Sequence, residues 1–297
     1  MPRIGLILWP SCTVVFDGKN VIAIGKPGVD GYYGPLFRGL IDGFAGHSVE
    51  IDTQYISTFE CLDYFRSSGV DGLILVATPS HDADALQNLA DAGVPFVAVS
   101  ASSPRPQDQH LPCVDTANYA GGQIAARHLI SLGHRRLACI NLGGRFVNQA
   151  DRMEGFQAAI AETCIPMGED SLLIEFEYIA HEFEARIERW LNDVVHGNRL
   201  PTGIFACDYA MVEATLKVLN RQGIAVPEQV SVVGFDDPSS AATLDPPLTT
   251  VRQPVYEMGV RAARRLVSAL ETSSVPVGTE IFPTELVVRA STGRPRD

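Results

Sequence analysis

The stretch from Val230 to Pro254, VSVVGFDDPSSAATLDPPLTTVRQP, is the part of the chain that decides its fold. An apolar, β-branched run reaches a glycine and an aromatic residue, and Asp236 and Asp237 follow before the pattern breaks into proline and serine. This order is typical of a buried parallel strand that ends at a site. Ligands of open α/β sheets lie at the carboxyl edge of the strands. We therefore expect both carboxylates to lie at a ligand site.

Local sequence supports a second interpretation of the same carboxylates. Aspartate that follows a strand and precedes Pro238 and Ser239 is also common as a turn residue or a helix N-cap. In the first interpretation a carboxylate accepts two hydrogen bonds from a polyol, and in the second it belongs to the local turn. The stretch alone leaves both open.

The remaining chain alternates segments of strand and helix character. Apolar runs of strand length lie at residues 4–9, 49–54, 70–76, 95–99, 137–142, 172–176, 203–207 and 230–235. Helical spacing lies between them, at residues 34–44, 59–67, 82–91, 153–162, 182–195 and 211–222, and in a helix capped by Asp115 or Thr116 that runs to Ser131. Such alternation predicts parallel sheets with helices on both faces, doubly wound because crossovers are right-handed.

Composition limits the class of protein. The chain has 297 residues, 46% hydrophobic, which is enough for two domains with separate cores. Its net charge of -12 argues against nucleic-acid binding by these residues, because such binding needs a basic surface. The amino terminus, MPRIGLILWP, has too short an apolar run for a secretion signal or a membrane span.

Cysteine and histidine spacing predicts neither a metal site nor disulfides. The six cysteines lie far apart without a CxxC pair, so we expect buried, reduced thiols, as in the cytoplasm. His128 and His134 are off the spacing that a helical metal pair requires. The GGR at residues 143–145 is neither a P-loop nor a dinucleotide fingerprint, so no cofactor is expected.

Three segments together resemble the LacI/GalR family of sugar-responsive transcription regulators. They are VSVVGFDD, DPPLTTVRQP and VDTANYAGGQIAARHLISLGHRRLACI at residues 114–140. The resemblance implies a periplasmic-binding-protein-like fold of type I, with two doubly wound parallel-sheet lobes joined by a hinge of three crossovers. The implied lobes are residues 1–132 with 252–276, and 133–251 with 277–297. A ligand between them would change the lobe angle.

The resemblance also implies which residues bind the effector. They are Arg152 in DRMEGF, Asp208 in IFACDYAM, Asp236 in the FDD run and Tyr178 in EFEYIAHEFE. Asp208 stands where the family usually has the asparagine of an Asn-Asp pair, and Tyr209 replaces the usual aspartate. One guanidinium, two carboxylates and an aromatic plane suit a neutral, hydroxyl-rich ligand such as a sugar, polyol or nucleoside.

The early part of the chain departs from the family. Residues 13–24, TVVFDGKNVIAI, predict a hairpin around Asp17-Gly18, where relatives have a short loop. This hairpin either covers the ligand cleft or is a surface feature. Trp9 and Phe16 either stack on a sugar or belong to the core.

Several expectations concern partners and alternatives. Relatives carry an amino-terminal helix-turn-helix that this chain lacks, so it would affect DNA only through a separate head, and it would form a homodimer through the first lobe. The principal alternative is a periplasmic sugar-binding protein of a transporter. A glycosidase that uses Asp208 and Asp236 is a remote alternative, because we expect Arg152 to lower the pKa of both carboxyls and oppose a general-acid role.

Overall fold

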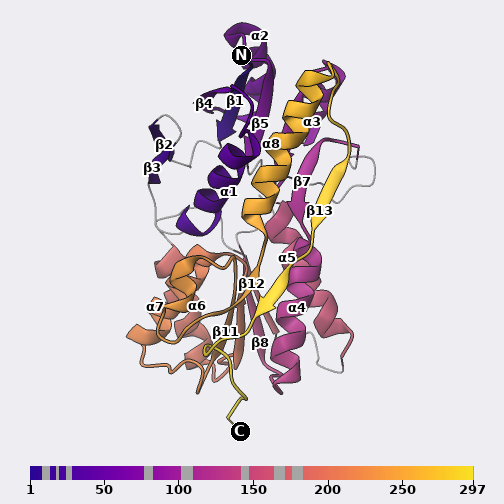
Figure 1. Ribbon diagram of the computed structural model, residues 1–297. Coiled ribbons are helices and arrows are strands. Elements are labelled where there is room, and N and C mark those ends of the chain that lie inside the picture. Colours follow the sequence, from indigo (N-terminus) through magenta and orange to yellow (C-terminus); the bar gives the residue numbers. More distant parts are fainter. Residues whose placement is uncertain are drawn as a thin grey trace. The chain divides into compact units, whose positions relative to one another are not determined.

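A computed structural model describes residues 1–8, 14–17, 20–24, 29–76, 83–101, 110–141, 147–163, 171–175 and 183–296. Its contacts divide the chain into two compact units. The first contains Met1–Thr116, Phe146–Asn148 and Pro254–Pro283, and the second contains Ala117–Arg145, Gln149–Gln253 and Thr284–Asp297. Each unit has its own parallel sheet with helices on both faces (Figure 1), which confirms the predicted α/β fold class.

The sheet of the first unit has the strand order β13-β7-β6-β5-β1-β4, and every pair is parallel. The strands are β1 (Arg3–Leu8), β4 (Glu50–Tyr55), β5 (Gly72–Val76), β6 (Phe96–Val99), β7 (Cys113–Thr116) and β13 (Thr279–Phe282). The central strands are buried on both faces, which is why they read as continuous apolar runs.

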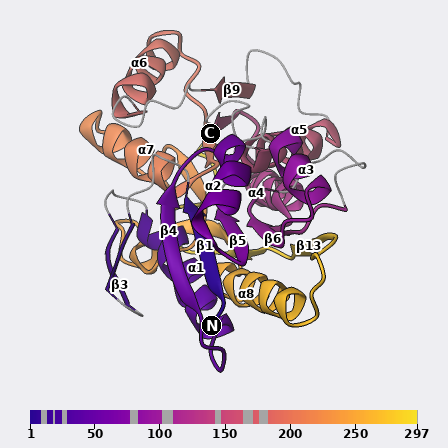
Figure 2. The ribbon, with the colours of Figure 1, turned by 90° about the horizontal axis from the view of Figure 1, so that it is seen from above.

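Helices cover both faces of this first sheet. They are α1 (Val29–Gly43), η1 (Thr58–Glu60), α2 (Cys61–Ser68), α3 (Ala83–Asp91) and α8 (Val255–Glu271). Helices α1 and α8 lie side by side in Figures 1 and 2 and share one apolar cluster with the sheet. Their approach is close at Gly39, where a Cβ atom would lie 2.1 Å from the carbonyl oxygen of Tyr256.

The second unit repeats this architecture with the strand order β14-β12-β11-β10-β8-β9. Its strands are β8 (Leu137–Asn141), β9 (Ser171–Glu175), β10 (Gly203–Ala206), β11 (Ser231–Phe235), β12 (Thr249–Arg252) and the antiparallel β14 (Glu285–Val287). The helical segments are α4 (Asn118–Ser131), α5 (Val147–Ala161), α6 (Phe183–His196), α7 (Tyr209–Arg221) and η4 (Ser239–Ala242). One apolar cluster packs α6 and α7, and another packs α4 and α5, against the sheet.

The predicted hairpin is present as a separate two-stranded antiparallel sheet of β2 (Val14–Asp17) and β3 (Asn20–Ile24). Nothing in the structure tests whether it covers a ligand. The four cysteines among the described residues, Cys61, Cys113, Cys139 and Cys207, are free and buried. None of the described helices is long and apolar enough to cross a membrane.

Two local predictions are wrong. Asp115 and Thr116 do not cap α4, because both belong to strand β7, and the N-cap residue is Ala117. Residues 279–288 do not all return to the second lobe, because β13 pairs with β7 in the first unit and only β14 joins the second sheet. A short apolar strand cannot be assigned to a sheet from its own sequence, since pairing partners are distant in the chain.

Helix α4 belongs to a different unit from the one that the predicted lobe bounds give. Those bounds place residues up to 132 in the first lobe, whereas the contacts of α4 are with the strands of the second unit. Gly121 lets α4 approach the ring of Phe235, and Gly122 lets it approach α5. The chain therefore changes unit before α4, at residues 116 and 117.

Candidate functional site

Asp236 lies directly after β11 in an unusual backbone conformation. Its φ is 67°, in the left-handed region that non-glycine residues seldom adopt, and its side chain is only 7% exposed. The Gln253 side-chain amide donates a hydrogen bond to its carboxylate, and the Thr250 hydroxyl donates to its backbone carbonyl oxygen. A strained residue fixed by two neighbours is a candidate functional position.

The helix N-cap interpretation of this carboxylate does not hold. The segment η4 begins at Ser239, and its N-cap is Pro238, which makes no side-chain capping bond. Asp237 has a structural role, because its carboxylate is ion-paired with Arg289 at 2.7 Å and with Arg252 at 2.7 Å. Of the two carboxylates, Asp236 is the one without a cation partner among the described residues.

Arg152 is a buried residue inside α5 and does not precede that helix, as the sequence suggested, because α5 starts at Val147. Its Nε donates to the Asn118 side-chain oxygen at 2.9 Å, and its Nη1 donates to the Cys207 carbonyl oxygen at 2.6 Å. The guanidinium lies 3.6 Å from the ring centroid of Phe235. Arg152 therefore joins the ends of β10 and β11, next to both predicted carboxylates.

Asp208 is the N-cap of α7, and its carboxylate accepts a hydrogen bond from the Ala210 amide at 2.7 Å. Burial and, next, the negative charge of Asp236 together raise the pKa of Asp208 to about 6, against the opposing effect of Arg152 and of backbone hydrogen bonds. We expected Arg152 to lower this pKa, and its positive charge does so, but burial and Asp236 outweigh it because the guanidinium forms no ion pair with Asp208 among the described residues.

Tyr209 is buried at the start of α7. Its hydroxyl shares a hydrogen bond of 2.7 Å with Ser240 in η4. This bond ties the helix that carries Asp208 to the segment that follows Asp236. The two aromatic residues predicted to contact a ligand, Trp9 and Tyr178, lie outside the described residues.

Sequence reasoning missed several polar residues at the carboxyl edges. Gln253 holds Asp236, and Asn118 holds Arg152. In the first unit, Ser100 follows β6 with a φ of 53° and is 5% exposed, and the Tyr32 hydroxyl donates to its side chain at 2.6 Å. The signal for Ser100 is the one that identified Asp236, a polar residue directly after a buried strand.

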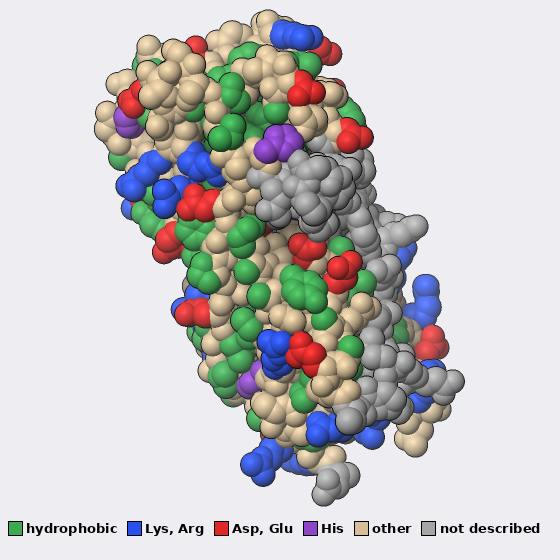
Figure 3. Space-filling view, turned by 90° about the vertical axis from the view of Figure 1, so that its right-hand side faces the viewer, with side chains coloured by type: hydrophobic (Ala, Val, Ile, Leu, Met, Phe, Trp, Pro, Cys, Tyr) green, Lys and Arg blue, Asp and Glu red, His purple; other side chains and the backbone are tan. Residues whose placement is uncertain are grey.

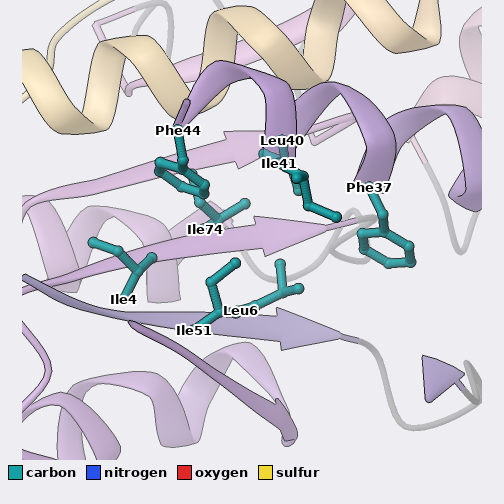
Figure 4. Close-up of a pocket in the computed structure, with 8 residues that line it drawn as sticks. All are labelled: Ile4, Leu6, Phe37, Leu40, Ile41, Phe44, Ile51 and Ile74. Carbon is teal, nitrogen blue, oxygen red and sulfur yellow. The ribbon is translucent and has the colours of Figure 1, made fainter. Parts of the chain in front are cut away.

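A small apolar pocket lies elsewhere, between α1 and the first sheet (Figure 4). It is lined by Ile4, Leu6, Phe37, Leu40, Ile41, Phe44, Ile51 and Ile74. These side chains offer no hydrogen-bonding group, so this pocket does not suit a hydroxyl-rich ligand. No cluster of three or more potential metal ligands occurs within the described part of the chain.

The fold and this site define a class of protein, the two-lobed α/β binding domain, in which polar side chains lie at the carboxyl edge of each sheet. A family profile described as a periplasmic binding protein-like domain matches residues 126–292. The chain belongs to the LacI family of transcriptional regulators and corresponds to their effector-binding domain.

Curated relatives support this membership. The regulator DegA of Bacillus subtilis is 31% identical over 288 residues, which are 92% of this chain and 81% of DegA. The regulator reg1 of Streptomyces lividans is 34% identical and covers 78% of this chain, which spans 67% of reg1. These relatives are helix-turn-helix transcription regulators and not enzymes, so the glycosidase alternative is wrong.

Solved structures show the same architecture. A LacI family regulator from Enterococcus faecium with bound ribose has a TM-score of 0.78 and 25% identity, and the match covers 99% of this chain and 100% of that one. The complex of the regulator CelR with cellobiose has a TM-score of 0.77 and 26% identity, over 97% and 84% of the two chains.

Proposed function

We propose that this chain is the effector-sensing part of a sugar-responsive regulator. It would bind a small hydroxyl-rich ligand between its two lobes through Arg152, Asp208 and Asp236, and the resulting change of lobe angle would control DNA binding by a helix-turn-helix. The observation that supports this most directly is the position of Arg152. It bonds the carbonyl beside Asp208 and stacks on the ring beside Asp236, so three residues far apart in the chain form one polar group.

The chemistry of this group suits hydroxyl recognition. The Nη2 of Arg152 donates no hydrogen bond to any described residue, and one oxygen of the Asp236 carboxylate accepts none from a described residue. A vicinal diol needs both a donor fork and acceptors. The names of two solved neighbours, which bind ribose and cellobiose, support a ligand of the sugar class.

Calorimetry tests this proposal. A screen of pentoses, hexoses, disaccharides, polyols and nucleosides by thermal shift selects binders, whose Kd is then measured for Arg152→Lys. Lysine keeps the charge but loses the planar fork, so we expect affinity to fall roughly thirty-fold or more. The control is Arg127→Lys on neighbouring α4, whose arginine pairs with Glu162 at the surface. Equal affinities in both variants, or a screen without binders, would contradict the proposal.

We also propose a homodimer that forms through the first unit. Edge strand β4 and the turn after it expose apolar side chains, with Ile51 36%, Tyr55 39% and Phe59 57% exposed. An edge strand with exposed apolar groups favours a partner surface. Sedimentation should give a dimer at tens of micromolar for the natural chain and a monomer for Ile51→Lys. A natural chain that sediments as a monomer would refute the proposal.

The described surface supports the expectation that the chain itself does not bind DNA. On the face in Figure 3, acidic groups lie beside the basic ones among the described residues. The net charge of -12 agrees. A salt-sensitive, sequence-specific gel shift with these 297 residues would contradict this expectation.

A further inference from the structure

Hydrogen-bond acceptors dominate the carboxyl edge of the second sheet. The Asp208 carboxylate accepts from the backbone of Ala210 and Met211, and the Asp236 carboxylate accepts from Gln253 through one oxygen, so the second oxygen of Asp236 accepts no bond from a described residue. The third acceptor is the Oε1 of Gln253, which is buried without a hydrogen-bond partner. Gln253 is only 6% exposed, and its Nε2 must face Asp236 because a carboxylate only accepts.

An unpartnered buried oxygen beside a carboxylate is costly unless something donates to it. Water or a ligand must therefore supply donors at this point. The side-chain oxygen of Gln253 adds an acceptor next to Asp236, because the amide nitrogen of the same side chain donates to that carboxylate. A group with several donors fits this arrangement better than one hydroxyl, which donates once.

The charges at the site point the same way. Asp208 and Asp236 carry two negative charges when ionised, and Arg152 carries one positive charge, which leaves one negative charge in excess. The Nε and Nη1 of the guanidinium already donate to Asn118 and to the Cys207 carbonyl, and its face lies on Phe235, so Nη2 is the nitrogen left to donate to a ligand. Mutual repulsion of the two carboxylates contributes to the raised pKa of Asp208, so the site gains from a further positive charge.

We propose that the ligand carries a protonated amine beside its hydroxyl groups, as an amino sugar or an amino polyol does, and that Asp208 selects it. This inference rests on the proposed function and replaces the neutral ligand expected from the sequence. An ammonium group has three donors and one positive charge, which match the three acceptors and the charge in excess. Asp208 contributes one of the two negative charges, so its removal tests the preference for a cation.

A neutral sugar offers a different solution, in which Asp208 takes up a proton on binding and donates to a hydroxyl. The two cases differ in which ligand binds better and in proton uptake. Among the described residues, the charged groups that act on the pKa of Asp208 are Asp236 at the end of β11 and Arg152 on α5. Both act on it in the free and bound chain, so matched ligands separate the cases.

Calorimetry at pH 7 uses matched pairs of ligands on the full chain. The pairs are D-glucose, D-galactose and D-mannose with their 2-amino-2-deoxy counterparts, and sorbitol with 1-amino-1-deoxysorbitol, and the N-acetyl derivative of each amino sugar removes the charge. We expect the amine of at least one pair to bind about ten-fold to a hundred-fold more tightly than its neutral partner and than its N-acetyl derivative.

The variant Asp208→Asn tests the residue. Asparagine caps a helix as well as aspartate does, so the fold is retained and only the charge is lost. We expect the preference for the amine to disappear in Asp208→Asn. It should persist in the control Asp193→Asn, which removes the same charge from an exposed position on α6.

The outcomes separate the two proposals. In one outcome the neutral sugars bind as tightly as the amino sugars, and calorimetry in buffers of different ionisation enthalpy detects proton uptake. This outcome would overturn the proposal of an amine-bearing ligand and leave the proposed sugar site intact. A preference that survives in Asp208→Asn would overturn the role of Asp208. If the chain bound neither a ligand of these pairs nor any ligand of the wider screen, the proposed function and this inference would both be overturned.

Discussion

Replacement of Asp236 separates a ligand contact from a purely structural residue. In Asp236→Ala the buried Gln253 amide loses its acceptor, which costs about 1 to 3 kcal/mol. An alanine held at a φ of 67° lowers the stability of the folded chain by about 1 kcal/mol more. We therefore expect the free energy of unfolding to fall by about 2 to 4 kcal/mol. From sequence alone the residue looked unimportant for stability, because neither the Gln253 bond nor the left-handed backbone was visible.

Asp236→Asn keeps both structural features. Asparagine tolerates the left-handed region, and its side-chain oxygen can still accept from Gln253. The free energy of unfolding of Asp236→Asn should stay within about 1 kcal/mol of that of the natural chain. Ligand affinity should nevertheless fall about ten-fold or more, because a charge-assisted bond becomes a neutral one, and the loss in Asp236→Ala should reach roughly thirty-fold to a thousand-fold.

Urea denaturation and calorimetry with a ligand from the screen measure the two effects on the same protein samples. The matched control is Asp237→Asn, which weakens the ion pairs with Arg252 and Arg289 and should lower stability while affinity stays unchanged. If Asp236→Asn bound the ligand as tightly as the natural chain, the carboxylate would be structural, and the reasoning that starts from the strand end would be refuted.

Three further predictions concern stability. Folding raises the pKa of Asp208 from 3.8 to about 6, so the folded state binds more protons than the unfolded state between these values. The free energy of unfolding should therefore fall as pH rises from 4 to 6. Urea titrations should show this slope in the natural chain and not in Asp208→Asn. Gly122→Ala places a Cβ 1.9 Å from the Arg152 carbonyl oxygen and should lower the free energy of unfolding by about 3 kcal/mol. In the control Gly46→Ala the new Cβ points into open space, and the free energy of unfolding should fall by about 1 kcal/mol. Equal losses of stability in the two variants would contradict the close crossing of α4 and α5. Tyr209→Phe removes the bond to Ser240 and should lower stability by about 1 kcal/mol in thermal unfolding, and an unchanged midpoint would show that the bond contributes nothing.

Much of the fold could be predicted because it depends on local pattern. Strand β11 is a buried β-branched run, and its apolar residues fix it as a central strand whatever surrounds it. The alternation of such runs with helical spacing implies parallel sheets, because parallel strands need crossovers. The same logic placed Asp236 at a strand end, where the structure has it, whereas Asp208 was named through the resemblance to the family.

Other features depend on which distant segments meet, and the sequence contains no local trace of them. Strand β13 joins the first sheet and β14 joins the second. Both strands are so short that the pattern of their own residues would fit either sheet. Arg152 stacks on Phe235, 83 positions away, only because the glycines of α4 allow α5 to pack closely.

The chain by itself therefore determined that this is a two-lobed α/β protein with acidic side chains at the carboxyl edge of a sheet. Tertiary structure alone decided how those acids behave. It half-buried Asp208 near Asp236, directed Arg152 to a carbonyl and an aromatic ring, and left the Gln253 oxygen without a donor. The physical reason is that burial and electrostatic fields depend on every neighbour in space, whereas strand and helix patterns depend on neighbours in the chain.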